Sequence, residues 1–313
     1  MARNKVQFQK GMSLNTFLQY YGTEDQCFEA LYKWRWSKGF LCPSCGHDRS
    51  CQLTNRKLQQ CNRCHHQTSI TAGTILESTK LSLTTWFQAI YLISQGKKCI
   101  SVMQLHRQLG ISYNAAWGLK HKLMQVMMER DQEYKLSGLI EIDDAYLGGE
   151  RTGCKPGRGA ADKSPFVAAV EKTEEGHPLR IKLSAVKGFR KTEIAAWSKQ
   201  HLTSGSIVVS DGLTCFTALA EEGYQHDRII CGGGRASVEE PKFYWVNTIL
   251  GNLKSTFRGI YHAVRPKYMQ RYLAEFQYRF NRRFDLSNLI PRLAYVALRT
   301  PPMPERLLKS GLA

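Results

Sequence analysis

The sequence predicts an α/β protein with a helical N-terminal part. Three observations lead to this fold class. Four cysteines form two C-x2-C pairs within residues 42–64, and a helix–turn–helix pattern follows them. After residue 136, short β-branched runs alternate with a helix, which is the order of an α/β domain. With 313 residues, the chain is long enough for two or three domains, each with its own core.

Composition narrows the possible partners. The chain has 44 Lys and Arg against 26 Asp and Glu, a net charge of +18. Such a charge favours a polyanionic partner, with nucleic acid first and an anionic membrane surface as the alternative. No apolar run approaches the roughly 20 residues that span a bilayer, and the N-terminus lacks the apolar segment of a signal peptide. We therefore expect a cytoplasmic, nucleoid-associated protein without a membrane partner.

Four of the ten cysteines are spaced for metal binding, with fifteen residues between the two pairs: Cys42, Cys45, Cys61 and Cys64. Each pair presents two thiolates to one ion, and the spacer lets the pairs meet as a tetrahedral site, which predicts structural Zn²⁺. His65 or His66 could replace a ligand, although Cys64 is better placed. The remaining cysteines, Cys51 included, are expected to be small core residues rather than disulfides in a reducing compartment.

Residues 76–136 are expected to form a helical DNA-binding domain. Apolar spacing predicts three helices, at about residues 82–95, 101–108 and 112–130. A Gly in the turn at position 110 and a plausible N-cap at Ser112 resemble a DNA-reading helix–turn–helix; any small helical bundle is the alternative. Lys120 and Lys122 on the last helix are candidate DNA contacts.

From residue 137 the pattern predicts four strands and one helix. The strands are expected in LIEIDDAYL, PFVAAVE, RIKLSAV and SIVVSDG, and the helix in KTEIAAWSKQHL. An apolar strand that ends in Asp211 delivers a carboxylate to the carboxyl edge of the sheet, where open α/β sheets keep their sites. Asp-Gly is also common turn chemistry. Further on, Asn247 and Lys254 are seven residues apart, about two helical turns, and so share one helix face.

These stretches resemble the DDE-type bacterial insertion-sequence transposases, in the zinc-ribbon group with a DD(E/N)K signature. Residues 141–149 match the E-[IV]-D-[DE]-x-Y-x-G-G strand, and residues 210–212 match the S-D-G strand end. The pattern [EN]-x6-K-x4-G-x-Y-H is matched by Asn247, Lys254, Gly259, Tyr261 and His262. Residues 271–284, RYLAEFQYRFNRRF, match the C-terminal helix of the group.

The resemblance implies an RNase H-like catalytic domain preceded by a zinc ribbon and a helix–turn–helix domain. The expected boundaries are 1–40 for an N-terminal helical segment, 41–75 for the zinc ribbon, 76–136 for the helix–turn–helix domain, 137–300 for the RNase H-like DDE domain and 301–313 for a tail.

The resemblance also implies a metal-dependent site. Asp143 and Asp211 would hold two Mg²⁺ or Mn²⁺ ions, Asn247 would be the third ligand, and Lys254 would stabilise charge near the scissile bond. Many relatives have Glu where this chain has Asn247, so Glu239 or Glu240 is the alternative third residue. Asp144 and Glu141 are expected to be supporting or solvent-facing.

The implied function is DNA transposition. The chain would bind terminal inverted repeats, catalyse strand cleavage and strand transfer into target DNA, and act as a homodimer or larger oligomer on paired ends. The alternatives are an RNase H-like nuclease or resolvase without strand transfer, and an inactive zinc and helix–turn–helix regulator. Aromatic residues every four positions, Tyr268 to Phe280, favour a core stripe over a base-stacking platform. Phosphate contacts are then expected from Arg271, Arg279, Arg282 and Arg283.

Overall fold

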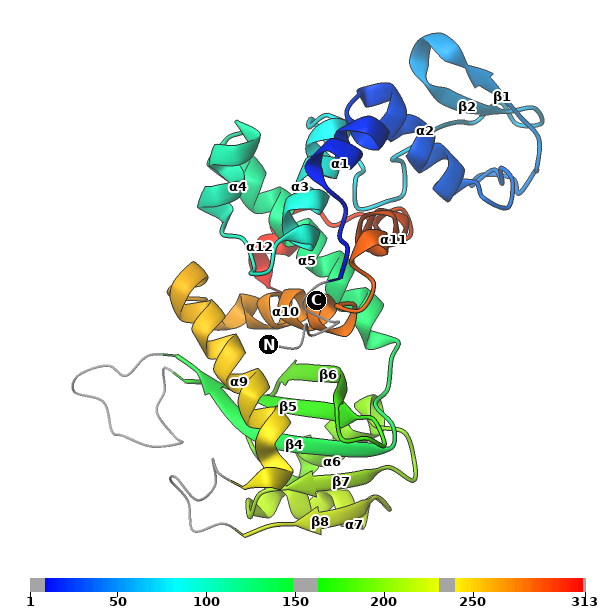
Figure 1. Ribbon diagram of the computed structural model, residues 1–313. Helices are drawn as coiled ribbons and strands as arrows, with labels where there is room; N and C mark the ends of the chain where they lie inside the picture. The colour runs from blue at the N-terminus through cyan, green and yellow to red at the C-terminus, as the bar shows by residue number, and fades with distance from the viewer. Residues whose placement is uncertain (1–8, 149–162, 231–239, 312–313) are drawn as a thin grey trace. The chain divides into compact units, whose positions relative to one another are not determined.

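The computed structural model describes residues 9–148, 163–230 and 240–311. Its chain forms two compact units. Unit 1 comprises Met1–Val126 together with Phe284–Ala313, and unit 2 comprises Met127–Arg283. Figure 1 shows the helices and strands of both units, with labels where there is room. Within the described residues, no helix has the length and apolar character needed to cross a bilayer.

Unit 1 begins with two helices, α1 (Leu14–Tyr21) and α2 (Glu24–Arg35), where the sequence predicted one helical segment. An antiparallel three-stranded sheet follows, in the order β1 (Ser50–Leu53), β2 (Leu58–Cys61) and β3 (Gln67–Ser69). The strands are three or four residues long and have few buried residues, because the sheet is too small to enclose a core of its own. The fold of this segment therefore depends on the cysteines that adjoin it.

The next three helices have nearly the bounds that the sequence predicted: α3 (Leu83–Gln95), α4 (Val102–Leu109) and α5 (Tyr113–Gln132). Each begins after a serine whose hydroxyl accepts a backbone N–H of the first turn: Ser82, Ser101 and Ser112. Gly110 ends α4 at a φ of +64°, a left-handed conformation that favours glycine. The helix, turn and helix are thus encoded locally.

The C-terminal segment belongs to unit 1, which differs from the expected boundaries of 137–300 for the catalytic domain and 301–313 for a tail. Helix α11 (Leu289–Ala297) packs on α2 and α3, and Leu289, Ile290 and Leu293 are buried. The side chain of Gln95 donates to the Leu286 carbonyl oxygen over 3.0 Å. Residues 305–310 form a helix, α12 (Glu305–Ser310), with Leu308 buried. The apolar face of α11 finds its partner in α3, far away in sequence.

Unit 2 is built around a mixed five-stranded sheet in the order β6-β5-β4-β7-β8. The strands are β4 (Leu139–Leu147), β5 (Ser164–Lys172), β6 (Pro178–Ala185), β7 (Ile207–Ser210) and β8 (Gln225–Arg228). Strand β5 runs antiparallel to β4 and β6, whereas β7 runs parallel to β4 and β8. The first four strands lie where the sequence predicted them; β8 was missed because QHDR has no apolar alternation.

Helices cover both faces of this sheet (Figure 1). Apolar residues of α9 (Tyr244–Thr256) and α10 (Met269–Asn281) pack on the face that carries Ala145, Ala168 and Val170. The opposite face packs on α6 (Lys191–His201), which has the predicted bounds within one residue, and on α7 (Ala218–Glu221). Of the predicted aromatic stripe, three members are partly buried against the first core: Tyr272, Phe276 and Phe280.

Helix α10 also closes the open edge of the sheet. Backbone N–H groups of three alternate residues of the edge strand β6 donate to amide side chains of α10 over 2.7 Å each: Ile181 to Asn281, Leu183 to Gln277 and Ala185 to Gln270. In return, Asn281 donates to the Ile181 carbonyl over 3.0 Å and Gln270 to the Leu183 carbonyl over 3.2 Å. An uncovered edge strand would be a template for pairing with other chains. The helix thus takes the place of a sixth strand.

We predict that Asn281→Leu destabilises the protein. The substitution leaves the N–H and C=O of Ile181, a fully buried residue, without side-chain partners, which costs about 1–3 kcal/mol. Urea unfolding measures the change in the free energy of unfolding. Asn252→Leu, on an exposed position of α9, is the matched control. Equal losses in the two variants would show that the amide bonds to β6 do not stabilise the fold.

Candidate metal centres and active site

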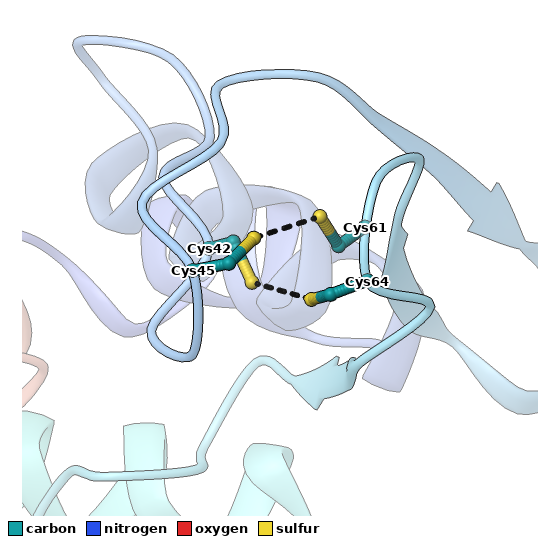
Figure 2. Close-up of side chains that lie close together, drawn as sticks. All are labelled: Cys42, Cys45, Cys61 and Cys64. Carbon is teal, nitrogen blue, oxygen red and sulfur yellow. Dashed lines mark hydrogen bonds between the residues drawn. The ribbon is translucent and has the colours of Figure 1, made fainter.

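The four predicted cysteines meet in unit 1. Their sulfur atoms all lie within 4.8 Å of one another, and Figure 2 marks two of these contacts, 3.5 Å from Cys42 to Cys64 and 3.6 Å from Cys45 to Cys61. The two C-x2-C pairs of the cluster have the same backbone hydrogen bond. Gly46 N–H donates to the Cys42 carbonyl over 2.9 Å, and His65 N–H donates to the Cys61 carbonyl over 3.1 Å.

This shared design explains the residues around the cysteines. Gly46 has a φ of +72° and His65 a φ of +57°, so both occupy the left-handed position after the second cysteine of a pair. His65 is therefore a turn residue, and Cys64 is the member of the cluster. Burial opposes ionisation of Cys61, but N–H donors of Cys64 and Arg63 outweigh it and lower the pKa of its thiol to about 6. Four sulfur atoms gathered in one cluster suit Zn²⁺.

The other cysteines follow the prediction in part. Cys27, Cys99 and Cys215 are buried, as expected of small core residues. Cys51 is exposed on β1, so its assignment to a core was wrong. The small sheet of β1, β2 and β3 does not bury both of its faces, so Cys51 remains exposed. Cys154 and Cys231 lie outside the described residues.

Three carboxylates meet in unit 2 because β4 and β7 are parallel and in register. Ile142 pairs with Ser210, so the residues that follow them, Asp143 and Asp211, lie side by side in the sheet. Carboxylate oxygens of Asp143, Asp144 and Asp211 all lie within 4.8 Å of one another. Asp211 also accepts the Leu213 N–H over 3.0 Å, which orients its side chain at the strand end.

The cluster is electrostatically unfavourable without a cation. Burial, together with repulsion from Asp144 and Asp211, raises the pKa of Asp143 from 3.8 to about 7. The positive charge of Lys254 acts in the opposite direction and lowers this pKa. Lys254 is therefore close enough to influence the cluster. Clustered hard oxygen ligands that repel one another suit Mg²⁺ or Mn²⁺.

Helix α9 carries the other two predicted site residues. Asn247 lies in its first turn, partly buried, and Lys254 lies exposed near its end. Glu240 precedes the helix and caps a 3-10 turn, Pro241–Phe243, by accepting the Lys242 N–H over 3.2 Å. It therefore does not share a face of α9 with Asn247. Glu239 lies outside the described residues.

Glu141 has a supporting position, and its contact with α9 was not predicted. Its side chain is only 1 % exposed and accepts backbone N–H groups of α9, which excludes the solvent-facing position that was the other expectation. The signal was present in the sequence. Glu141 interrupts an apolar pair, Ile140 and Ile142, and lies on the same face of β4 as Asp143, because strand side chains alternate.

Two predicted DNA contacts, Lys120 and Arg271, are wrong because their side chains are buried. Lys120 is fully buried, and its ammonium group donates to the Ile100 carbonyl. Arg271 is 2 % exposed, and burial lowers its pKa. Lys122 is partly buried beside the Trp86 ring, 5.9 Å from its centroid, and burial lowers its pKa. The helical spacing identified faces of α5 and α10, but both helices are largely enclosed.

The other predicted arginines also have internal partners. Arg282 pairs with the buried Asp131 over 2.8 Å and lies 3.6 Å from the Tyr278 ring centroid. Arg283 donates to the carbonyl groups of Pro178, Leu179 and Phe280, and burial lowers its pKa to about 10. Arg279 is partly buried. Arg282 and Arg283 thus join α10 to other parts of unit 2 and are not available to phosphates.

Two family models match the chain in these regions. The model of the ISXO2-like transposase domain matches residues 135–281, which include the carboxylate cluster, and the transposase zinc-ribbon domain matches residues 22–67. The chain therefore carries a transposase domain and a transposase zinc ribbon. The zinc-ribbon match begins at residue 22, so it includes α2 as well as the cysteine cluster.

A curated relative agrees with this assignment. It is described as an uncharacterized protein in transposable element ISH50 of Halobacterium salinarum, 25% identical over 242 residues, which are 71% of this transposase and 78% of the relative. Crystal structures of the Mos1 strand transfer complex and of the Mos1 mariner paired-end complex with Mn are 11% identical. They cover 63% and 66% of this chain and 76% and 75% of their own, with TM-scores of 0.20 and 0.24. TM-scores this low do not establish a shared fold.

For the cysteine cluster, we predict one tightly held Zn²⁺ per transposase chain, as measured by elemental analysis. Cys61→Ser should lose the zinc and unfold the ribbon, because a structural zinc site supplies folding free energy that this small sheet lacks. Cys51→Ser is the matched control, since Cys51 lies on the same ribbon outside the cluster. Full zinc content in the Cys61→Ser variant would exclude the site.

The carboxylate cluster should make the stability of the transposase depend on pH. Because the pKa of Asp143 is raised from 3.8 to about 7, the folded chain keeps a proton there that the unfolded chain loses between these pH values. Without added divalent cation, the free energy of unfolding should fall as pH rises through this window. Asp143→Asn should remove that fall and stabilise the protein at pH 8 by at most about 4 kcal/mol, at about 1.4 kcal/mol per pKa unit.

Urea unfolding at pH 5 and pH 8 measures this difference. Glu174→Gln, which removes an exposed carboxylate in the same unit, controls for the change in net charge. The same pH dependence in the Asp143→Asn variant and in the unaltered protein would show that Asp143 is not destabilised by its surroundings.

Proposed function

We propose that this transposase binds terminal inverted repeats and catalyses metal-dependent DNA strand cleavage and strand transfer. The observation that carries the proposal is the cluster of Asp143 and Asp144, in the middle of β4, with Asp211, directly after β7, within the transposase domain match. Phosphodiester chemistry needs closely spaced anionic oxygen ligands of this kind, because the attacked group is itself negatively charged.

The donor set fits divalent metal ions. Oxygen ligands that repel one another strongly enough to raise a carboxyl pKa to about 7 are stabilised by a bound cation. We assign Asp143 and Asp211 as ligands, with Asn247 offering a neutral carbonyl oxygen and Lys254 its positive charge. Two bound Mg²⁺ or Mn²⁺ ions would supply activation of the attacking oxygen and neutralisation of the leaving oxygen. Lys254 would hold a phosphate near the cluster.

We propose that unit 2 has the RNase H-like fold that the family resemblance implies. A mixed five-stranded sheet with helices on both faces, and with the carboxylates on adjacent parallel strands, supports this assignment. In this arrangement β4 and β7 supply the aspartates, and α9 supplies Asn247 and Lys254 from the helix that covers the same face as Asp143.

DNA recognition is assigned to the zinc ribbon and to the helix–turn–helix of α4 and α5. Only the start of α5 is exposed enough to enter a groove of DNA. Tyr113 and Asn114 are exposed at its start, whereas the helix is largely buried from Leu119 onward. Such recognition helices contact bases with their N-terminal residues. Exposed basic residues of the ribbon could contact phosphates: Lys38, Arg49, Arg56 and Arg63.

Strand transfer of two transposon ends into target DNA would require two catalytic sites, so we propose at least a homodimer on paired ends. The clustered carboxylates oppose the alternative of an inactive zinc and helix–turn–helix regulator, because such a protein would have no use for three repelling acids. A nuclease or resolvase without strand transfer is distinguished by its products. Joining of labelled end DNA to a plasmid separates the two activities.

We predict that Asp143→Ala and Asp211→Ala each abolish cleavage of labelled transposon-end DNA in Mg²⁺ or Mn²⁺ but retain end binding. Each substitution removes an anionic metal ligand, whereas binding is assigned to unit 1. Asn247→Ala should slow cleavage less, since a neutral ligand contributes less to metal affinity. Glu240→Ala is the control, because its carboxylate caps a neighbouring turn. Near-normal cleavage by Asp143→Ala would overturn the proposed mechanism, and a severe Glu240→Ala defect would move the third ligand.

A further inference from the structure

Glu141 is a buried carboxylate that connects the strand and the helix of the proposed active site. Its Oε2 accepts two consecutive backbone N–H groups in the first turn of α9, from Trp245 over 3.0 Å and from Val246 over 2.8 Å. Its Oε1 pairs with the ammonium group of Lys172, on the neighbouring strand β5, over 2.9 Å. The Glu141 side chain is 1 % exposed and that of Lys172 is 12 % exposed.

The helix lacks a cap of its own. Phe243 occupies the N-cap position of α9 and provides no side-chain hydrogen bond, so the first N–H groups need acceptors from elsewhere. A carboxylate at this end is favoured by hydrogen bonding and by the helix dipole. Lys172 offsets part of the cost of burying its charge. Glu141, a residue of the sheet, therefore caps α9 in place of a residue next to the helix in sequence.

An apolar residue at position 141 would fill the space but would not fix how α9 lies on β4. Ala145, on the same face of β4, already packs in the apolar cluster with α9, but such contacts are non-directional. Two hydrogen bonds to adjacent N–H groups instead fix the distance and the rotation of the helix relative to the strand. The buried charge thus specifies one arrangement of α9 on β4.

That arrangement determines where the proposed catalytic groups lie. Asp143 follows Glu141 by two residues and projects from the same face of β4. Asn247 directly follows the two capped residues, Trp245 and Val246, and Lys254 lies two helical turns further along. A shift of α9 along β4 would move Asn247 and Lys254 away from Asp143 without unfolding either element.

We propose that Glu141 is a positioning residue, whose carboxylate holds α9 in the register that brings Asn247 and Lys254 to the aspartate cluster. The inference deepens the proposed function and rests on it. Glu141 acts through the backbone of Trp245 and Val246. It requires an acceptor oxygen at full side-chain length, whereas its negative charge serves mainly to balance Lys172.

The first measurement does not involve catalysis. Amide hydrogen exchange in the full-length protein should show faster exchange at Trp245 and Val246 in the Glu141→Ala variant, by at least tenfold, with little change at the buried strand β5. Glu141→Gln keeps an oxygen at the same reach and should retain most of the protection. Unchanged exchange at Trp245 and Val246 in Glu141→Ala would overturn the proposal.

The second measurement is the cleavage rate at saturating end DNA. Glu141→Ala should lower kcat about 100-fold, the order of loss that a misplacement of about 1 Å produces, with Kd for end DNA within twofold of the unaltered protein. Glu141→Gln should recover to within tenfold. Glu141→Asp, which keeps the charge but is one methylene shorter, should remain as slow as Glu141→Ala. A higher kcat for Glu141→Asp than for Glu141→Gln would show that the charge of the side chain, rather than its length, is required. That result would overturn the proposal.

Asn281→Leu separates positioning from general stability. It removes hydrogen bonds within the same unit, to β6, and should lose stability while cleaving at the unaltered kcat. An equal loss of kcat in this control would reduce Glu141 to a stabilising residue and overturn the proposal. Cleavage by the unaltered protein and none by Asp143→Ala establish the assay. Should both fail to cleave, the proposed function fails, while the exchange measurement still tests the cap.

Discussion

The parallel pairing of β4 with β7 is the constraint on which the proposed site depends. Because Ile142 pairs with Ser210, the next residues of both strands, Asp143 and Asp211, must lie side by side. A shift by one residue would turn one aspartate to the opposite face of the sheet. The buried neighbours oppose such a shift, since Ile140, Ile142 and Val208 pack in one apolar cluster beneath α6 and α7. Ordinary core packing therefore fixes the spacing of the carboxylates.

The same constraint creates a cost that the rest of unit 2 must offset. Three carboxylates within 4.8 Å repel one another, and burial adds to the destabilisation of the Asp143 anion. Apolar cores on both faces of the sheet supply most of the opposing stabilisation. The amide side chains of α10 add directional bonds at the edge strand β6. The packing of unit 2 thus keeps the three carboxylates close together although they repel one another. Such a loss of stability is common at functional sites.

The sequence predicted the parts of the molecule that local patterns encode. Apolar spacing, the turn at Gly110 and the cap at Ser112 placed α3, α4 and α5 to within about two residues, and apolar runs placed four strands of the sheet. What it missed depends on contacts between distant segments. Spacing could show that Lys120 lies on α5 but not that α5 is enclosed, and it could not show that Glu141 would meet the backbone of Trp245, 104 residues away. The strand β8 forms only because β7 offers it an edge.

The buried cations change how the net charge of +18 should be interpreted. Arg282 pairs with Asp131, Lys182 donates to the carbonyl groups of Asp131 and Tyr134, and Lys120 is fully buried. These groups satisfy internal acceptors and so add little to attraction at the surface. Their removal would lower stability more than DNA affinity. The electrostatic footprint must therefore come from exposed residues, and the arginines of the zinc ribbon, Arg49, Arg56 and Arg63, are better candidates for phosphate contacts than the arginines of α10 and its end.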